Sequence, residues 1–89
     1  MQKKEKRNVS ITGQLSPFHI EIDRNRRGFS LSCNGVKGIT EFSDSQIKLQ
    51  LSSFSILVIG VDLSMTVFED TCVEIIGRFC EVSFVYGKT

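Results

Sequence analysis

Among the side chains of this 89-residue chain that could carry out acid–base chemistry are two acidic groups, Glu69 with Asp70 and Glu41 with Asp44. General acid–base catalysis needs a carboxyl group whose surroundings move its pKa toward the working pH. Both groups fall in segments that we expect to be exposed turns, where carboxyl groups keep ordinary pKa values. We therefore interpret Asp44 and Asp70 as turn residues that bond nearby backbone N–H groups, and we predict no catalytic residue.

Cysteine and histidine side chains offer a second kind of chemistry, metal binding. The chain has three cysteines and one histidine, and no two cysteines have the C-x-x-C spacing of zinc sites. The number of cysteines is odd, and the basic N-terminus is not followed by the hydrophobic segment of a signal peptide. Together these features favour free thiols in a reducing compartment. We expect no metal, no cofactor and no enzymatic activity, with Cys33 acting as a small buried hydrophobe.

Basic residues are concentrated at the front of the chain. Residues 1–27 hold seven of the eleven Lys and Arg against three acids, although the net charge of the whole chain is only +1. The basic cluster at the start is typical of a solvated tail, which we place at residues 1–7. We expect a single β domain over residues 8–89. The second basic cluster, predicted to lie on a loop tip between two strands, consists of Arg24, Arg26 and Arg27.

Apolar and polar residues alternate with a period of two along most of the chain, which is typical of half-buried strands. We expect strands over residues 18–23, 29–33, 46–51, 54–59, 65–67, 73–76 and 82–86, with a further short strand at 9–11. The connections are too short for parallel crossovers, so neighbouring strands should be antiparallel. The predicted fold is all-β: a small, single-domain, hairpin-rich antiparallel sheet, arranged as a meander, a sandwich or a short stacked β-solenoid.

Two glycines and a near-repeat refine this expectation. Gly60 should produce a bulge or bend after one strand, and Gly77 should mark a corner before the last strand. The segment 42–49 returns as 68–75, and each copy places an aromatic residue, an Asp and a small hydroxyl residue before an alternating apolar run. This pattern predicts a strand, a polar turn and a second strand, used twice.

The segment 54–59 is apolar on both faces from Ile56 onward, in a chain too short to cover both faces of a sheet by itself. A partner chain should therefore cover what the domain leaves open. In the last strand, Val82, Phe84 and Tyr86 are expected on the core face. The residues that we predict at an interaction surface are Leu57, Ile59, Ile76 and Val85, together with Arg24, Arg26 and Arg27.

The order of these segments resembles the YabP/YqfC-like sporulation proteins over roughly residues 29–86, and the YqfC type more than the YabP type. In residues 29–43, a strand ending in Asn34 leads through a basic residue and Gly38-Ile39 into an acid–aromatic–Ser turn. The segments 47–60, 62–64 and 73–78 are similar in order and spacing to that family's Ile-x-Gly-x-x-Leu and Ile-x-Gly core.

The resemblance implies a role in endospore formation in the mother cell, without a catalytic motif. It also implies a membrane-protein partner and a place in the cytoplasm or at the surface of the membrane surrounding the forespore. We predict no transmembrane segment in the chain itself, because its longest nearly apolar run, residues 54–63, is about half the length that crosses a bilayer. Two alternatives stay open: a self-associating structural protein of a spore layer, and a small β-barrel that binds nucleic acid, although we expect no nucleic-acid partner.

Overall fold

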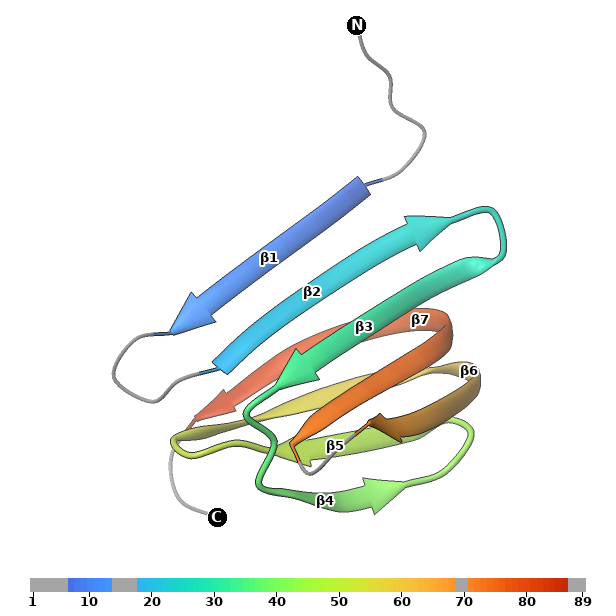
Figure 1. Ribbon diagram of the computed structural model, residues 1–89. Coiled ribbons are helices and arrows are strands. Elements are labelled where there is room, and N and C mark those ends of the chain that lie inside the picture. The colour runs from blue at the N-terminus through green and yellow to red at the C-terminus, as the bar shows by residue number, and fades with distance from the viewer. Residues whose placement is uncertain (1–6, 14–17, 69–70, 87–89) are drawn as a thin grey trace, which may run out of the picture.

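The computed structural model describes residues 7–13, 18–68 and 71–86, with the backbone alone for residues 7–13 (Figure 1). It contains seven strands, and the all-β prediction is confirmed. No helix occurs in the described ranges. The strands are β1 (Arg7–Gly13), β2 (Phe18–Asn25), β3 (Gly28–Asn34), β4 (Gly38–Phe42), β5 (Gln46–Gln50), β6 (Phe54–Phe68) and β7 (Cys72–Tyr86).

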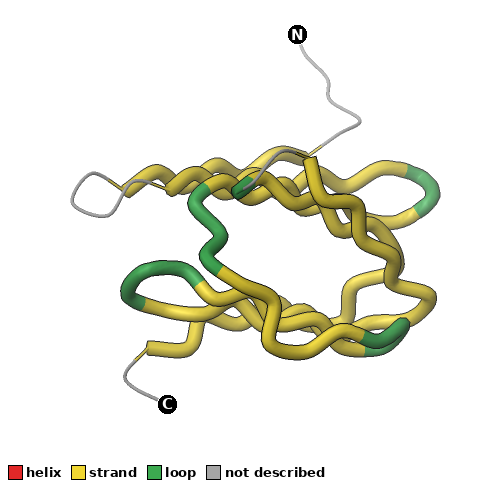
Figure 2. Tube along the Cα trace, turned by 60° about the horizontal axis from the view of Figure 1, so that its bottom comes forward, coloured by secondary structure: helices red, strands yellow, loops and turns green. Residues whose placement is uncertain are grey.

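The strands form one antiparallel sheet in the order β1-β2-β3-β7-β6-β5-β4. This sheet folds over on itself into two layers (Figure 2). The first layer contains β1, β2 and β3 with the first half of β7 and the second half of β6. The second layer contains β4 and β5 with the first half of β6 and the second half of β7. Strands β6 and β7 are therefore shared by both layers.

The sharing of β6 and β7 corrects one prediction about element boundaries. Residues 54–59 and 65–67 were expected as separate strands, and Gly77 as a corner between two more, but β6 and β7 each run unbroken for 15 residues. The predicted bulge at Gly60 is confirmed, because the β6–β7 register shifts between Ile59 and Gly60 and again between Val61 and Ser64. The bulges bend the strand without ending its pairing.

Glycine is required where the bent strands approach one another. A Cβ atom on Gly60 would lie 2.2 Å from the backbone oxygen of Arg78, and one on Gly77 would lie 2.8 Å from Leu63 Cδ2. Gly77 also has a φ of 150°, which a residue with a side chain rarely adopts. Between these glycines, Asp62 has a positive φ of 55°, and its neighbour Leu63 is buried.

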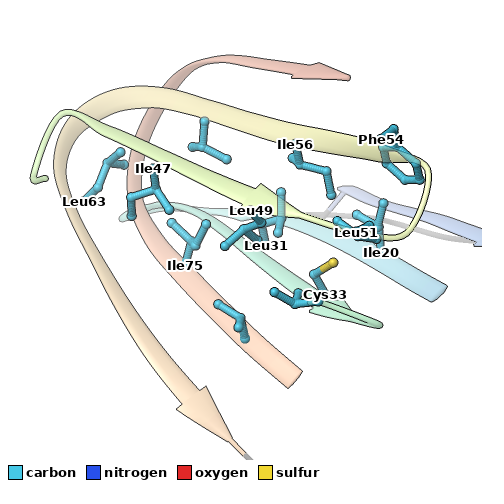
Figure 3. Packing of buried hydrophobic residues seen from close by; sticks show 13 residues of the cluster. Ile20, Leu31, Cys33, Ile47, Leu49, Leu51, Phe54, Ile56, Leu63 and Ile75 are labelled. Atoms are coloured by element: carbon cyan, nitrogen blue, oxygen red, sulfur yellow. The ribbon is translucent and has the colours of Figure 1, made fainter. Parts of the chain in front are cut away.

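The core fills the space between the two layers (Figure 3). It collects the inward residues of the alternating strands, as the period-two pattern predicts. The first layer contributes Ile20, Leu31, Cys33, Val73 and Ile75, and the second contributes Ile47, Leu49, Phe54, Ile56 and Val58.

Both copies of the near-repeat connect antiparallel neighbours. In the first copy, β4 and β5 flank a turn in which the Ser43 hydroxyl accepts hydrogen bonds from the backbone N–H groups of Ser45 and Gln46, at 3.2 and 3.0 Å. Ser43 thus takes the bonding role that was predicted for Asp44. In the second copy, Phe68 of β6 pairs with Cys72 of β7, and Asp70 lies outside the described residues.

Candidate interaction surfaces

The predicted interaction residues fall into two groups in the structure. Leu57, Ile59 and Val85 lie on the outward face of the second layer, where each is only half-buried. Their cross-strand partners are polar: Lys48 is opposite Leu57, and Ser55 is opposite Val85. This face therefore has no continuous row of fully exposed apolar residues.

The second group lies where the β2–β3 turn approaches the bend of β6 and β7. There a cavity of about 370 Å³ is lined by Arg27 from the turn, Phe29 and Ile76 from neighbouring strands, and Asp62 and Arg78 from the bend. We call this cavity the arginine pocket. Two residues predicted from distant segments, Arg27 and Ile76, thus line the same cavity.

The β2–β3 turn presents its arginines from a defined backbone. The Asn25 side chain accepts hydrogen bonds from the backbone N–H groups of Arg27 and Gly28, at 2.9 and 3.1 Å. Gly28 has a φ of 144°, and a Cβ atom on it would lie 2.5 Å from the backbone oxygen of Gly77. The turn therefore packs directly against β7, and a side chain at position 28 would prevent this close contact.

Positive charge predominates around the arginine pocket. The Arg24 guanidinium lies 5.9 Å from the centre of the Phe29 ring, a distance that permits a cation–π contact. Arg26, Arg27 and Arg78 are exposed, and no ion pair joins any of these arginines to another residue in the described ranges. Asp62 is the acid in the lining, and Asp23 precedes Arg24 on β2 with contacts of its own.

Arg78 and Asp62 were not predicted as site residues. Arg78 looked like part of a corner, and Asp62 like part of a bend after Gly60. Only the pairing of β6 with β7, in which Val61 lies opposite Arg78, brings them beside the β2–β3 turn. The signal that could have found them is the pair of glycines, because glycine in a strand marks a close approach of backbones.

A second surface lies along the last half of β7. Phe54 of β6 stacks with Phe84 and Tyr86 of β7, with ring centres 5.7 and 5.3 Å apart. Phe18 of β2 packs edge-on against Phe54 at 5.0 Å. We call these four residues the aromatic edge.

The aromatic edge is only partly covered. Phe84 and Tyr86 are on the predicted core face, opposite Ile56 and Phe54, yet they are 36% and 69% exposed. The reason is that β3 pairs with β7 only as far as Gly77. Beyond that point, β7 has β6 on one side and no ladder partner on its other side within the described part of the chain.

The cysteines differ in environment. Cys33 is buried, Cys72 is half-buried and Cys80 is exposed, and all three are free. Burial raises the pKa of the Cys33 thiol to about 12, with a smaller contribution from the neighbouring Cys72. The described residues contain no cluster of His, Cys, Asp and Glu suited to a metal ion. They also contain no helix long and apolar enough to cross a membrane.

The chain was compared with known protein families, curated proteins and solved structures. A model of the YabP family matches residues 19–89, a range that includes every residue lining the arginine pocket and three of the four residues of the aromatic edge. No curated protein and no solved structure matches the chain significantly.

Proposed function

This chain belongs to the YabP family, a membership that implies a sporulation-associated role, and we propose that it serves that role as a non-enzymatic interaction module. The observation that carries the proposal is the aromatic edge. The large side chains of Phe84 and Tyr86 are exposed on the second half of β7, which has no described ladder partner on the side away from β6. Such an edge suits the addition of a strand from another protein, whose backbone supplies hydrogen bonds while its side chains cover the aromatic rings.

The proposed partner is a membrane protein of the mother cell, and the proposed place of action is the cytoplasmic surface of the membrane around the forespore. The resemblance of roughly residues 29–86 to the YqfC type within the family supports both parts. Assignment of the chain to that type is likewise a proposal. The described residues contain no membrane-spanning helix, and a membrane-protein partner would bring the domain to the membrane surface.

Complementation in a spore-forming host tests the proposal. Deletion of the gene should sharply lower the number of heat-resistant spores while vegetative growth continues. Tyr86→Lys, which places a charge on the exposed aromatic edge, should fail to restore sporulation. The matched control is Phe42→Lys on β4, because Phe42 is similarly exposed at 61% but lies at the opposite edge of the second layer. Normal sporulation of the deletion strain would reject the sporulation role, and full rescue by Tyr86→Lys would reject the aromatic edge.

The partner can be identified directly by replacing Tyr86 with a photocrosslinking amino acid and irradiating sporulating cells. The expected product is a covalent adduct with a membrane protein that the same replacement at Phe42 does not yield. Adducts of equal yield from both positions would contradict docking at the aromatic edge.

Self-association is the second candidate function. The observation that favours it is that β4 and the second half of β7, at opposite edges of the second layer, each have one ladder neighbour among the described strands. Copies joined edge to edge would extend the sheet. Light scattering after size-exclusion chromatography distinguishes the two candidates, because self-association gives a mass that rises with concentration, and a discrete monomer or dimer at high concentration excludes it.

A further inference from the structure

The arginine pocket has the shape of a binding site for a few side chains. Its volume of about 370 Å³ lies at the lower end of the range of about 300–1,000 Å³ that is usual for ligand sites. Its walls come from the β2–β3 turn and the bend of β6 and β7. The close contact between Gly28 and Gly77 holds these two elements together. The site is therefore formed before any ligand arrives.

The lining combines charge with an apolar wall. Arg27 and Arg78 contribute guanidinium groups that form no ion pair with another described residue. Ile76, which is 47% exposed, and Phe29 contribute the apolar part. Asp62 offsets only part of the positive charge. Unpaired guanidinium groups beside an apolar wall suit a ligand that has carboxylates next to an apolar side chain.

We propose that the arginine pocket binds an acidic segment of a partner protein, with a carboxylate at Arg27 and Arg78 and an apolar side chain against Ile76. This inference goes beyond the proposed function, because it rests on the arginine pocket alone and does not require the aromatic edge. Arg24 at the end of β2 and Arg26 on the turn attract the acidic segment without lining the cavity.

A protein segment fits this surface better than a membrane or a nucleic acid. Lipid headgroups and nucleic-acid backbones present phosphates over an extended surface, and proteins that bind them carry basic residues along a track or a broad face. Here the arginines surround one concavity. The strand β7 beyond Arg78 carries the exposed acid Glu81, so the positive charge does not continue along this strand as a track.

Fluorescence anisotropy with short labelled peptides tests the inference. The probe is a peptide of four glutamates around one leucine, and the comparison peptide has glutamine in place of glutamate. The purified full chain should bind the glutamate peptide and not the glutamine peptide, and binding should weaken as salt is added. A third peptide with alanine in place of leucine should bind more weakly than the probe.

Variants locate the binding. Arg27→Glu and Arg78→Glu should each weaken binding of the glutamate peptide by at least about tenfold, because each removes a charge-assisted contact and adds a repulsive charge. The matched control is Lys37→Glu, which makes the same charge change on an exposed residue just beyond the opposite end of β3. Ile76→Ser should remove the preference for leucine over alanine. Circular dichroism and thermal unfolding establish that each variant is folded.

Three results would overturn the inference. The first is that the wild-type chain does not bind the glutamate peptide. The second is that Lys37→Glu weakens binding as much as Arg27→Glu, which would indicate attraction by overall charge. The third is that vesicles containing phosphatidylglycerol, or single-stranded DNA, bind to the wild-type chain and lose binding in Arg27→Glu while the peptide does not bind. Tyr86→Lys, which alters the aromatic edge, should leave peptide binding unchanged. Loss of peptide binding therefore tests the arginine pocket, and loss of sporulation in Tyr86→Lys tests the proposed function.

Discussion

The two halves of strand β7 have the same kind of sequence and very different surroundings. Residues 72–77 lie between β3 and β6, and their inward side chains, Val73 and Ile75, are 2% and 0% exposed. Among the described strands, residues 79–86 have β6 as their one ladder neighbour, and two of their inward side chains, Phe84 and Tyr86, are 36% and 69% exposed. Both halves alternate in phase with the core.

The two halves of β7 show that the face a side chain occupies and the degree to which that face is covered are separate properties. Alternation decides which face of the sheet a side chain occupies, because successive residues of a strand point to opposite faces. The strands on either side decide how much of that face is covered. In β7 the bend at Gly77 removes one neighbour, so core-facing aromatic residues become a surface.

The largest expected effect tests the covered half. Ile75→Ala should lower the free energy of unfolding by about 2–5 kcal/mol, because it removes a fully buried side chain and leaves a cavity between the layers. Urea unfolding followed by circular dichroism measures the change. A loss below about 1 kcal/mol would mean that the first half of β7 is no better packed than the second.

The bend between the two halves should be nearly as sensitive. Gly77→Ala should cost about 2–3 kcal/mol, because the new methyl group would meet Leu63 and Asp62 at a φ that disfavours any side chain. Gly38→Ala is the control, since a Cβ atom on Gly38 has nothing within 4 Å. Similar stability of the two variants would show that the bend can relax at low cost.

Two cysteines report on the two halves of β7: Cys33 lies opposite the covered half, and Cys80 lies on the second half. Cys33 pairs with Val73 in the covered half, and burial raises the pKa of its thiol from the ordinary 9.0 to about 12. Above pH 9 the Cys33 thiol therefore keeps its proton in the folded state and loses it in the unfolded state. The contribution of the protonated thiol to the free energy of unfolding is complete below pH 9 and declines from pH 9 toward 12. At pH 10 the contribution lost should be about 1.4 kcal/mol.

This loss is measured as the change in the free energy of unfolding between pH 8 and pH 10, in wild type and in Cys33→Ala. The variant should show a smaller decrease than wild type. Alkylation of the native protein adds a second comparison, in which exposed Cys80 reacts quickly and buried Cys33 is protected. Equal decreases in the two proteins would mean that Cys33 does not titrate differently on folding.

The smallest effect on stability is expected at the aromatic edge. Tyr86→Ala should lower the free energy of unfolding by no more than about 1 kcal/mol, since the ring is mostly exposed and loses chiefly its stacking with Phe54. Urea unfolding with Ile75→Ala as reference measures the difference between the halves. A loss at Tyr86 equal to that at Ile75 would remove the basis for treating this edge as an open surface.

Much of the fold could be predicted because its strands carry their pattern locally. Ile20, Leu31 and Leu49 alternate with polar residues and all three are in the core. The continuity of β6 and β7 could not be predicted, because a glycine within a strand pattern normally indicates an interruption. Here Gly60 and Gly77 let paired strands bend together, and the ladder continues through the bend.

The candidate surfaces were predicted less completely than the fold. Arg27 and Ile76 were identified separately, one as part of a charged turn and one as an outward apolar residue, and the structure places both in the arginine pocket. Phe84 was expected on the core face and lies on that face, but the missing neighbour of β7 exposes it. Arg78 gave no local signal of its role.

The amino-acid sequence by itself determined the strand class, the face that most of the predicted strands bury and the resemblance to the YabP family. These properties depend on neighbouring residues along the chain, because pleating and turn geometry are local. Only the tertiary structure decided which strand edges stay open and which distant side chains meet. Those outcomes depend on how β6 and β7 bend and which strands pair beside them, and such long-range pairing is set by the packing of the whole sheet.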